Sequence, residues 1–271
     1  MTPAKVDAIA KAVIYEGYLL YPYRTSNIKN QQRFTFGGVY PPAFDLSTMQ
    51  TQCLLTGGPS AEVEITVRFL HLVQNGDVVE RTVQAPSGIN FDGLDGRVEV
   101  ARDEIRPGLT RLTVRIVNSS AVVPADRDQA LRHTFLSTHT ILSVREGAFP
   151  SMADPPEDFR EAAAACQNVG TWPVLVGEPG EHDTLLSSPI ILEDYPRVAE
   201  ESPGDLFDAT EVDELLSLSI LSLTDEEKAQ MRTVDERARE LLARTEALTA
   251  DDLLKLHGSM RGMRTLREES T

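Results

Sequence analysis

Hydrophobic and polar residues alternate along much of the first half of the chain. In the segment VEITVRFLHLV, the apolar residues Val63, Ile65, Val67 and Phe69 fall on one face with a period of two. This alternation, in a run rich in β-branched and aromatic residues, predicts a β-strand. Residues 109–117 alternate in the same way, which is typical of an antiparallel strand with one solvated face, and residues 133–144 have a similar character.

Turn residues separate these strands. Asn75-Gly76 follows the first strand directly and predicts a hairpin with a type I′ turn, in which DVVERTV is the return strand. Several short strands separated by Gly, Pro and Asn predict an antiparallel β-sandwich or flattened barrel over residues 1–150 rather than alternating βα units.

The pattern changes after residue 150. ADPPEDFREAAAACQNVG predicts a helix with a proline-marked start that stops at Gly170, whereas TWPVLVG and SSPIILEDYP predict edge strands or extended segments. Three helices are then expected: one in ATEVDELLSLSILSL, one that begins at Thr224 with Glu227 in a capping box, and one from Thr249 to Gly258. The predicted fold class is α+β, with a sandwich-like domain (1–150), an acidic connector of short helices and extended segments (151–223) and a C-terminal helical region (224–271).

Charge divides the chain in the same way. Residues 1–150 hold equal numbers of acidic and basic side chains, so the net charge of −16 falls on the second half. Such a charge repels nucleic acid and anionic lipid surfaces. No segment approaches the roughly 18 apolar residues of a membrane-spanning helix, and the N-terminus lacks a signal-peptide pattern. We therefore expect a soluble, cytoplasmic protein with no nucleic-acid or membrane partner.

The acidic segment 193–214 is the first candidate functional surface. Its spacing lacks the alternating Asp/Asn positions and the glycine of a calcium loop, and Asp208 with Glu211 fits a helix cap. We interpret the segment as a docking surface for a basic protein partner. The predicted partner-binding residues are Asp194, Glu200, Glu201, Asp205, Asp208, Glu211, Asp213 and Glu214.

An aromatic and basic stretch near the N-terminus supports an alternative. Interleaved aromatic and cationic side chains can hold a ligand, although tyrosines at alternate strand positions also pack into sheets with their hydroxyls at the rim. In this alternative the protein is a β-sandwich module that binds a small ligand or a metal. The ligand-binding residues would be Tyr15, Tyr21, Tyr23, Arg24 and Arg33.

Histidines and cysteines give weaker signals. His71, His133 and His139 could lie on one sheet face as a metal triad, and a hydrolase that uses His71 or His139 is a further alternative. Cys53 and Cys166 are far apart in apolar contexts and are expected to be free and buried. The sequence holds no nucleophile elbow, P-loop, dinucleotide fingerprint or zinc-protease helix. We therefore predict no catalytic residues, no metal site and no cofactor.

The segments EGYLLYPYR, RFTFGGVYP, MQTQC and SPIILEDYPRVAEESPGDLFDATEVDELLSLSILSLTDEEK resemble a family of uncharacterised proteins encoded beside bacterial nickel–iron hydrogenase genes. The resemblance runs through most of the chain. It implies a cytoplasmic role in assembling, maturing or scaffolding a hydrogenase, with no established catalytic residues. The leading hypothesis is therefore a non-enzymatic accessory protein that binds a hydrogenase subunit or maturation factor through its acidic segment.

Overall fold

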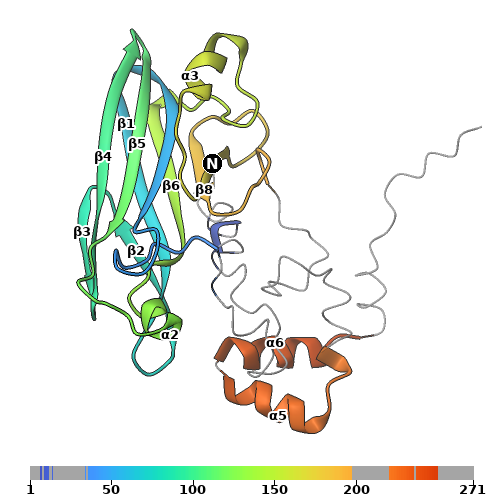
Figure 1. Cartoon of the computed structure of the whole chain (residues 1–271). Helices are drawn as coiled ribbons and strands as arrows, with labels where there is room; N and C mark the ends of the chain where they lie inside the picture. Colours follow the sequence, from blue (N-terminus) through green and yellow to red (C-terminus); the bar gives the residue numbers. More distant parts are fainter. Residues whose placement is uncertain are drawn as a thin grey trace, which may run out of the picture. The chain divides into compact units, whose positions relative to one another are not determined.

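The computed structural model describes residues 7, 9–11, 14, 34, 36–196, 220–234 and 236–249. The chain divides into two compact units, one made of residues 1–19 and 32–198 and the other of residues 20–31 and 199–271. The first unit holds the β-sheet, and the second holds two helices (Figure 1).

The first unit is built on one antiparallel sheet of eight strands that does not close on itself within the described residues. The strands follow the order β3-β4-β5-β1-β6-β8-β7, and β2 pairs with β1 beside this path. Their bounds are β1 Thr48–Leu72, β2 Val78–Gln84, β3 Ser87–Phe91, β4 Leu94–Arg106, β5 Leu109–Asn118, β6 Leu136–Ala148, β7 Trp172–Leu175 and β8 Thr184–Ser188. A sheet-rich N-terminal part followed by helices confirms the predicted α+β class at this level.

Strand β1 is long because it serves two sets of neighbours. Residues 48–56 pair with β5, residues 56–57 and 62–70 pair with β6, and residues 66–72 pair with β2. The pairing with β6 shifts register between Gly57 and Glu62, where Gly57 has a φ of 148° that favours glycine. The interruption therefore separates a first half that pairs with β5 from a second half that pairs with β2, while β6 pairs with residues on both sides of it.

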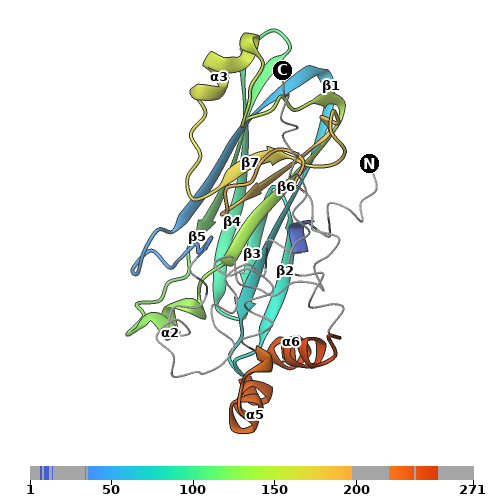
Figure 2. The same ribbon diagram turned by 90° about the vertical axis from the view of Figure 1, so that its right-hand side faces the viewer.

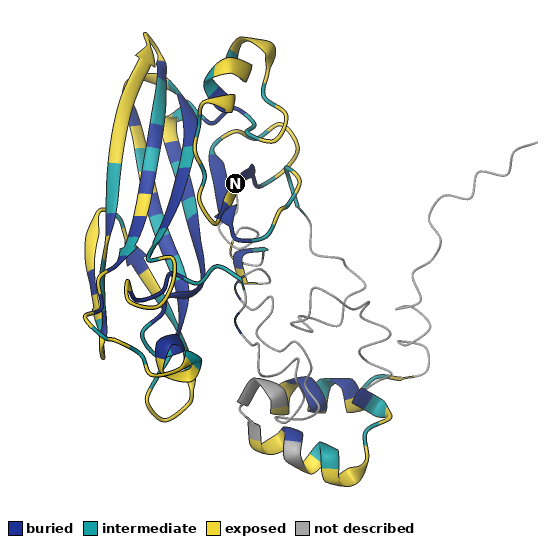
Figure 3. Ribbon diagram, viewed as in Figure 1, coloured by how far each residue is buried: buried dark blue, intermediate teal, exposed yellow. Residues whose placement is uncertain are grey.

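The core lies on one face of both halves. Met49 and Cys53 from the first half join Ile65, Val67 and Phe69 from the second in one buried cluster that also includes residues of β2–β6 and β8. The Thr51 hydroxyl donates to Ser187 Oγ of β8 at 2.8 Å, although β1 and β8 are not neighbouring strands. Figure 3 shows this buried interior and the exposed outer part of β4, residues 101–106.

The predicted hairpin is confirmed, but its turn type was wrong. Leu72 pairs with Val78 across the loop, and Val73 N–H donates to the Asp77 carbonyl. Gly76 has a φ of 92°, while Asn75 is not among the residues with positive φ. A type I′ turn needs positive φ at both central residues; the bond from Gly76 N–H to the Val73 carbonyl instead closes a longer loop with a single left-handed glycine.

Strand β5 confirms the predicted half-solvated strand, since Leu112, Val114 and Ile116 are buried while Arg115 is exposed. Strand β6 begins at Leu136, later than the predicted start at His133, because α2 (Arg127–Leu131) and a turn precede it. Near its start, Ser137 and Thr138 of β6 lie opposite the single residue Phe69 of β1, and Ser137 takes a φ of 48° there.

Residues 151–196 belong to the sheet unit. The predicted helix is short, consisting of η2 (Glu157–Phe159) and α3 (Arg160–Ala164), and it ends well before Gly170. Strand β7 pairs only with β8 and lies at the edge of the sheet, as predicted for a proline-containing segment. The sheet unit thus extends beyond residue 150, where the sequence placed its end. Figure 2 shows α3 and α2 at opposite ends of the long strands.

The second unit contains α5 (Asp225–Val234) and α6 (Glu236–Glu246), where the sequence predicted one helix. The capping box is confirmed, because Thr224 N–H donates to Glu227 Oε2 and Glu227 N–H donates to Thr224 Oγ1. Most of the first predicted helix and all of the third after Thr249 lie outside the described residues. In the part that is described, none of the helices combines the length and apolar character needed to cross a membrane.

Candidate functional site

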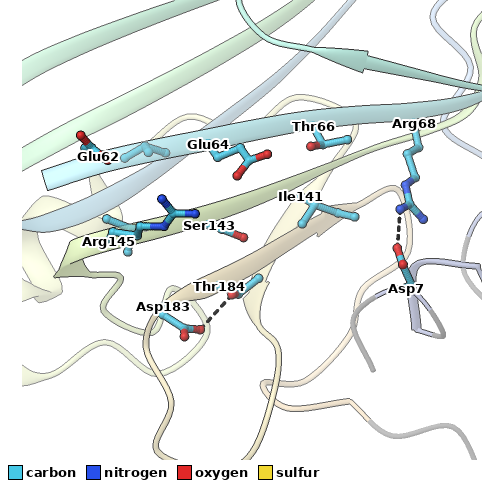
Figure 4. Close-up of a pocket in the computed structure, with 12 residues that line it drawn as sticks. Asp7, Glu62, Glu64, Thr66, Arg68, Ile141, Ser143, Arg145, Asp183 and Thr184 are labelled. Carbon is cyan, nitrogen blue, oxygen red and sulfur yellow. Dashed lines mark hydrogen bonds and ion pairs between the residues drawn. The ribbon is translucent and has the colours of Figure 1, made fainter. Parts of the chain in front are cut away.

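A groove lies on the face of β1 and β6 that points away from the core. The register pairs Glu62 with Arg145, Glu64 with Ser143, and Thr66 with Ile141, so these side chains share one face. Asp183 and Thr184, at the start of β8, extend the lining, and the groove has a volume of about 630 Å³ (Figure 4). Its floor is therefore built from regular strands.

One end of the groove carries charged side chains that have no partner among the described residues. Glu62, Glu64 and Arg145 are exposed, and none of their side chains makes a hydrogen bond or ion pair within the described part of the chain. Glu62 and Arg145 are cross-strand neighbours, yet no contact of 4.0 Å or less joins them. Both signs of charge are thus available to a binding partner at this end.

At the opposite end of the groove, carboxylates of the same chain neutralise the charge of Arg68. The Arg68 guanidinium forms an ion pair with Asp7 and a second one, at 4.0 Å, with Glu80. Its side chain is only 20% exposed, and its Nε–H is buried without an acceptor. This end is therefore closed by the protein itself.

Asp7 forms part of the wall at this closed end. Ala10 is fully buried against Val174, Val176 and Leu186 of the β7–β8 region, and Ile9 packs on the same apolar cluster. This packing places Asp7 beside Arg68, as Figure 4 shows.

His139 lies next to Arg68 at the closed end of the groove. It is the direct cross-strand partner of Arg68 and is completely buried. Burial lowers the pKa of His139 from 6.5 to about 4, the Ser137 carbonyl partly offsets this effect, and the nearby Arg68 charge lowers the pKa further. With Nδ1 3.2 Å from the Ser137 carbonyl oxygen, Nδ1 is the donor, and Nε2 remains a buried acceptor without a donor.

Among the predicted partner-binding residues, only Asp194 is described. Its carboxylate accepts hydrogen bonds from Ser151 Oγ at 2.5 Å and from Leu175 N–H at 2.8 Å, and the Leu175 carbonyl accepts from Tyr195 N–H. These bonds occupy the free edge of β7, so Asp194 has a structural role there. The other seven residues, from Glu200 to Glu214, lie outside the described residues.

The residues of the alternative ligand site also lie outside the described part of the chain. These are Tyr15, Tyr21, Tyr23, Arg24 and Arg33. Whether they gather at the mouth of a ligand site stays a prediction.

The histidine triad does not form. His71 lies on the core side of β1 with Phe69, whereas His139 pairs with Arg68 and lies on the opposite face. Among the described residues, no group of three or more His, Cys, Asp or Glu side chains could hold a metal ion. Burial and the Arg81 charge lower the pKa of His71, while Asp92 raises it and His133 lowers it.

Both cysteines are free. Cys53 is fully buried, as expected, while Cys166 is only partly buried. Burial raises the pKa of both thiols, with a further increase for Cys53 from Cys166 and a decrease for Cys166 from Arg111. Neither environment favours a thiolate nucleophile at neutral pH.

Sequence reasoning missed the groove, although part of its signal is visible in the sequence. The alternation that identified Val63, Ile65 and Val67 as core residues also places Glu64, Thr66 and Arg68 together on the other face. Only the pairing with β6 and β8, and the packing of residue 7, turns that polar face into a groove.

No family model and no curated protein matches the chain. The resemblance to hydrogenase-associated proteins therefore stays a prediction.

Proposed function

We propose that this chain is a non-enzymatic binding protein whose groove between β1 and β6 receives a positively charged segment of a protein partner. The observation that carries the proposal is the pair of unpartnered carboxylates, Glu62 and Glu64, held on a regular strand at the open end of the groove. Fixed, unpaired charges of this kind steer an oppositely charged partner and set its register.

The lining favours a polypeptide over a small molecule. Small-molecule sites are mostly apolar and enclosed, with a few polar groups. Here the outward residues are largely charged or hydroxylated, and the apolar contribution comes mainly from Ile141 and the adjacent Val63 and Val144. An open, polar surface is typical of the rim-like contacts of transient protein complexes.

The resemblance suggests the partner. We infer an accessory role in which the groove binds a hydrogenase subunit or a maturation factor, and the acidic residues from Glu200 to Glu214 would add long-range attraction for the same basic partner. For the fold, we propose the finer description of a β-sandwich. The Thr51–Ser187 bond, which links strands that are not neighbours in the sheet, supports it.

The test compares three forms of the full chain, each tagged and expressed in cells that contain the hydrogenase genes. The Glu62→Gln/Glu64→Gln variant removes both groove charges while keeping side-chain size, and Glu104→Gln removes one exposed charge on β4 as a control. We expect the wild type and the control to capture a hydrogenase subunit or maturation factor, and the groove variant to capture about tenfold less. The affinity for the purified partner should fall by the same factor.

Equal capture by all three forms would contradict a role for the groove. Capture that fails in every form, with the hydrogenase proteins present in the same lysate, would contradict the partner assignment.

A further inference from the structure

We propose that the segment bound in the groove is extended and carries two basic side chains two residues apart. This inference rests on the proposed function and specifies the chemistry of the partner. It follows from the geometry of the groove floor rather than from the number of acidic residues.

The spacing of the carboxylates sets the spacing of the cations. Glu62 and Glu64 are two residues apart on one strand face, and a strand rises about 3.3 Å per residue, so their Cα atoms lie roughly 7 Å apart. Alternate side chains of an extended segment repeat at the same roughly 7 Å. An extended partner with a basic-x-basic sequence can therefore place one cation on each carboxylate.

The width of the floor also favours an extended segment over a helix. The floor consists of neighbouring strands, which are about 4.8 Å apart. A helix with its side chains is about 10–12 Å wide and would span more than two strands. An extended segment has the dimensions of one strand and fits along β1.

The other groups in the groove complement such a segment. Arg145 is exposed and has no side-chain partner among the described residues, so it can donate to the backbone carbonyls of an extended chain, which has no internal donors for them. The hydroxyl of Ser143, which pairs with Glu64 across the strands, also has no hydrogen bond among the described residues. At the closed end, Arg68 is already paired with Asp7, so no third cation is required there.

The experiment uses the purified full chain and three labelled peptides of identical composition, each capped at both ends. GTKTKTG has lysines at alternate positions, GTKKTTG has adjacent lysines, and GKTTTKG has the i, i+4 spacing of a helix. Fluorescence anisotropy at low salt measures the dissociation constant for each peptide. We expect GTKTKTG to bind at least about fivefold more tightly than either isomer.

Variants connect this preference to the groove. Glu64→Gln should abolish the difference between the peptides, whereas the control Glu104→Gln should preserve it. Equal affinities of the three peptides for the wild type, which would reflect only attraction to an acidic chain, would overturn the inference. So would a preference that survives in Glu64→Gln.

The two proposals can fail separately. If partner capture depends on Glu62 and Glu64 but the peptides bind alike, the groove function stands and the extended segment is wrong. If the preference among the peptides depends on Glu64 but partner capture does not depend on Glu62 and Glu64, the inferred spacing of the cations is supported and the proposed function is wrong.

Discussion

The two halves of β1 show how one strand can serve as core in one place and as a binding surface in another. Residues 48–56 are largely buried on both faces, because Leu54 packs on Ala163 of α3 while Gln52 N–H donates to Asn168 Oδ1. Residues 62–68 alternate strictly, with Ile65 and Val67 buried and Glu62 and Glu64 exposed. What differs is the segment that covers the outer face, which residues 159–169 provide for the first half only.

The largest expected effect is in the covered half. Leu54→Ala should lower the free energy of unfolding by about 2–5 kcal/mol, because it removes a fully buried side chain between the sheet and α3. Glu62→Ala in the open half should change stability by no more than about 0.5 kcal/mol. Urea unfolding followed by the fluorescence of Trp172, the only tryptophan, reports on the sheet unit. Similar losses of unfolding free energy in the two variants would contradict the proposed difference between the covered and open halves of β1.

His139, at the closed end of the groove, should make the free energy of unfolding depend on pH. The unfolded chain takes up a proton at His139 near pH 6.5, but the folded protein does so only near pH 4, so stability falls as the pH drops through this window. The loss approaches ~3 kcal/mol for this group. His139→Gln should flatten the curve of unfolding free energy against pH by about that amount. Parallel curves for His139→Gln and wild type would show that His139 is not held neutral.

The hydroxyl contact across the core should have an intermediate effect. Ser187 Oγ bonds both Thr51 and Thr171 at 2.8 Å, and all three residues are buried. Ser187→Ala leaves two buried hydroxyls without this partner and should cost about 1–3 kcal/mol of unfolding free energy. Ser143→Ala, on the groove face without a hydrogen bond, is the matched control and should be close to neutral. If both serines prove neutral, the polar contact does not stabilise the core.

The smallest stability effect is expected at the edge of β7. Asp194→Ala removes the acceptor for Leu175 N–H and Ser151 Oγ and should cost about 1–2 kcal/mol, whereas Asp194→Asn keeps an oxygen acceptor and should cost less. Neither variant should weaken partner capture. Reduced capture with unchanged stability would return Asp194 to the docking surface that its sequence context suggested.

Local sequence patterns correctly predicted the elements whose formation depends on residues close together in the sequence. The alternation in β1 and β5, the hairpin after β1 and the capping box at Thr224 all depend on residues close in sequence, and the structure contains each of them. The turn at Gly76 was assigned to the wrong type because the dipeptide signal does not fix the loop length.

Long-range pairing decided what the sequence left open. The histidine triad failed because strand register, set by the pairing of Arg68 with His139, places His71 and His139 on opposite faces. The sequence placed Asp194 in an acidic patch. In the structure it accepts a hydrogen bond from Leu175 at the edge of β7, 19 residues earlier in the chain. The groove itself needs residue 7, β1, β6 and β8 together, and no single segment predicts that meeting.

The central claim is that a cationic segment binds the open half of β1 and leaves the covered half alone. Amide chemical-shift mapping of the isotope-labelled full chain, titrated with GTKTKTG, tests it directly. We expect shift changes at residues 62–68 and 141–145, none at 48–56, and loss of these changes in the Glu62→Gln/Glu64→Gln variant. Changes confined to other surfaces, or changes that persist in the variant, would contradict it.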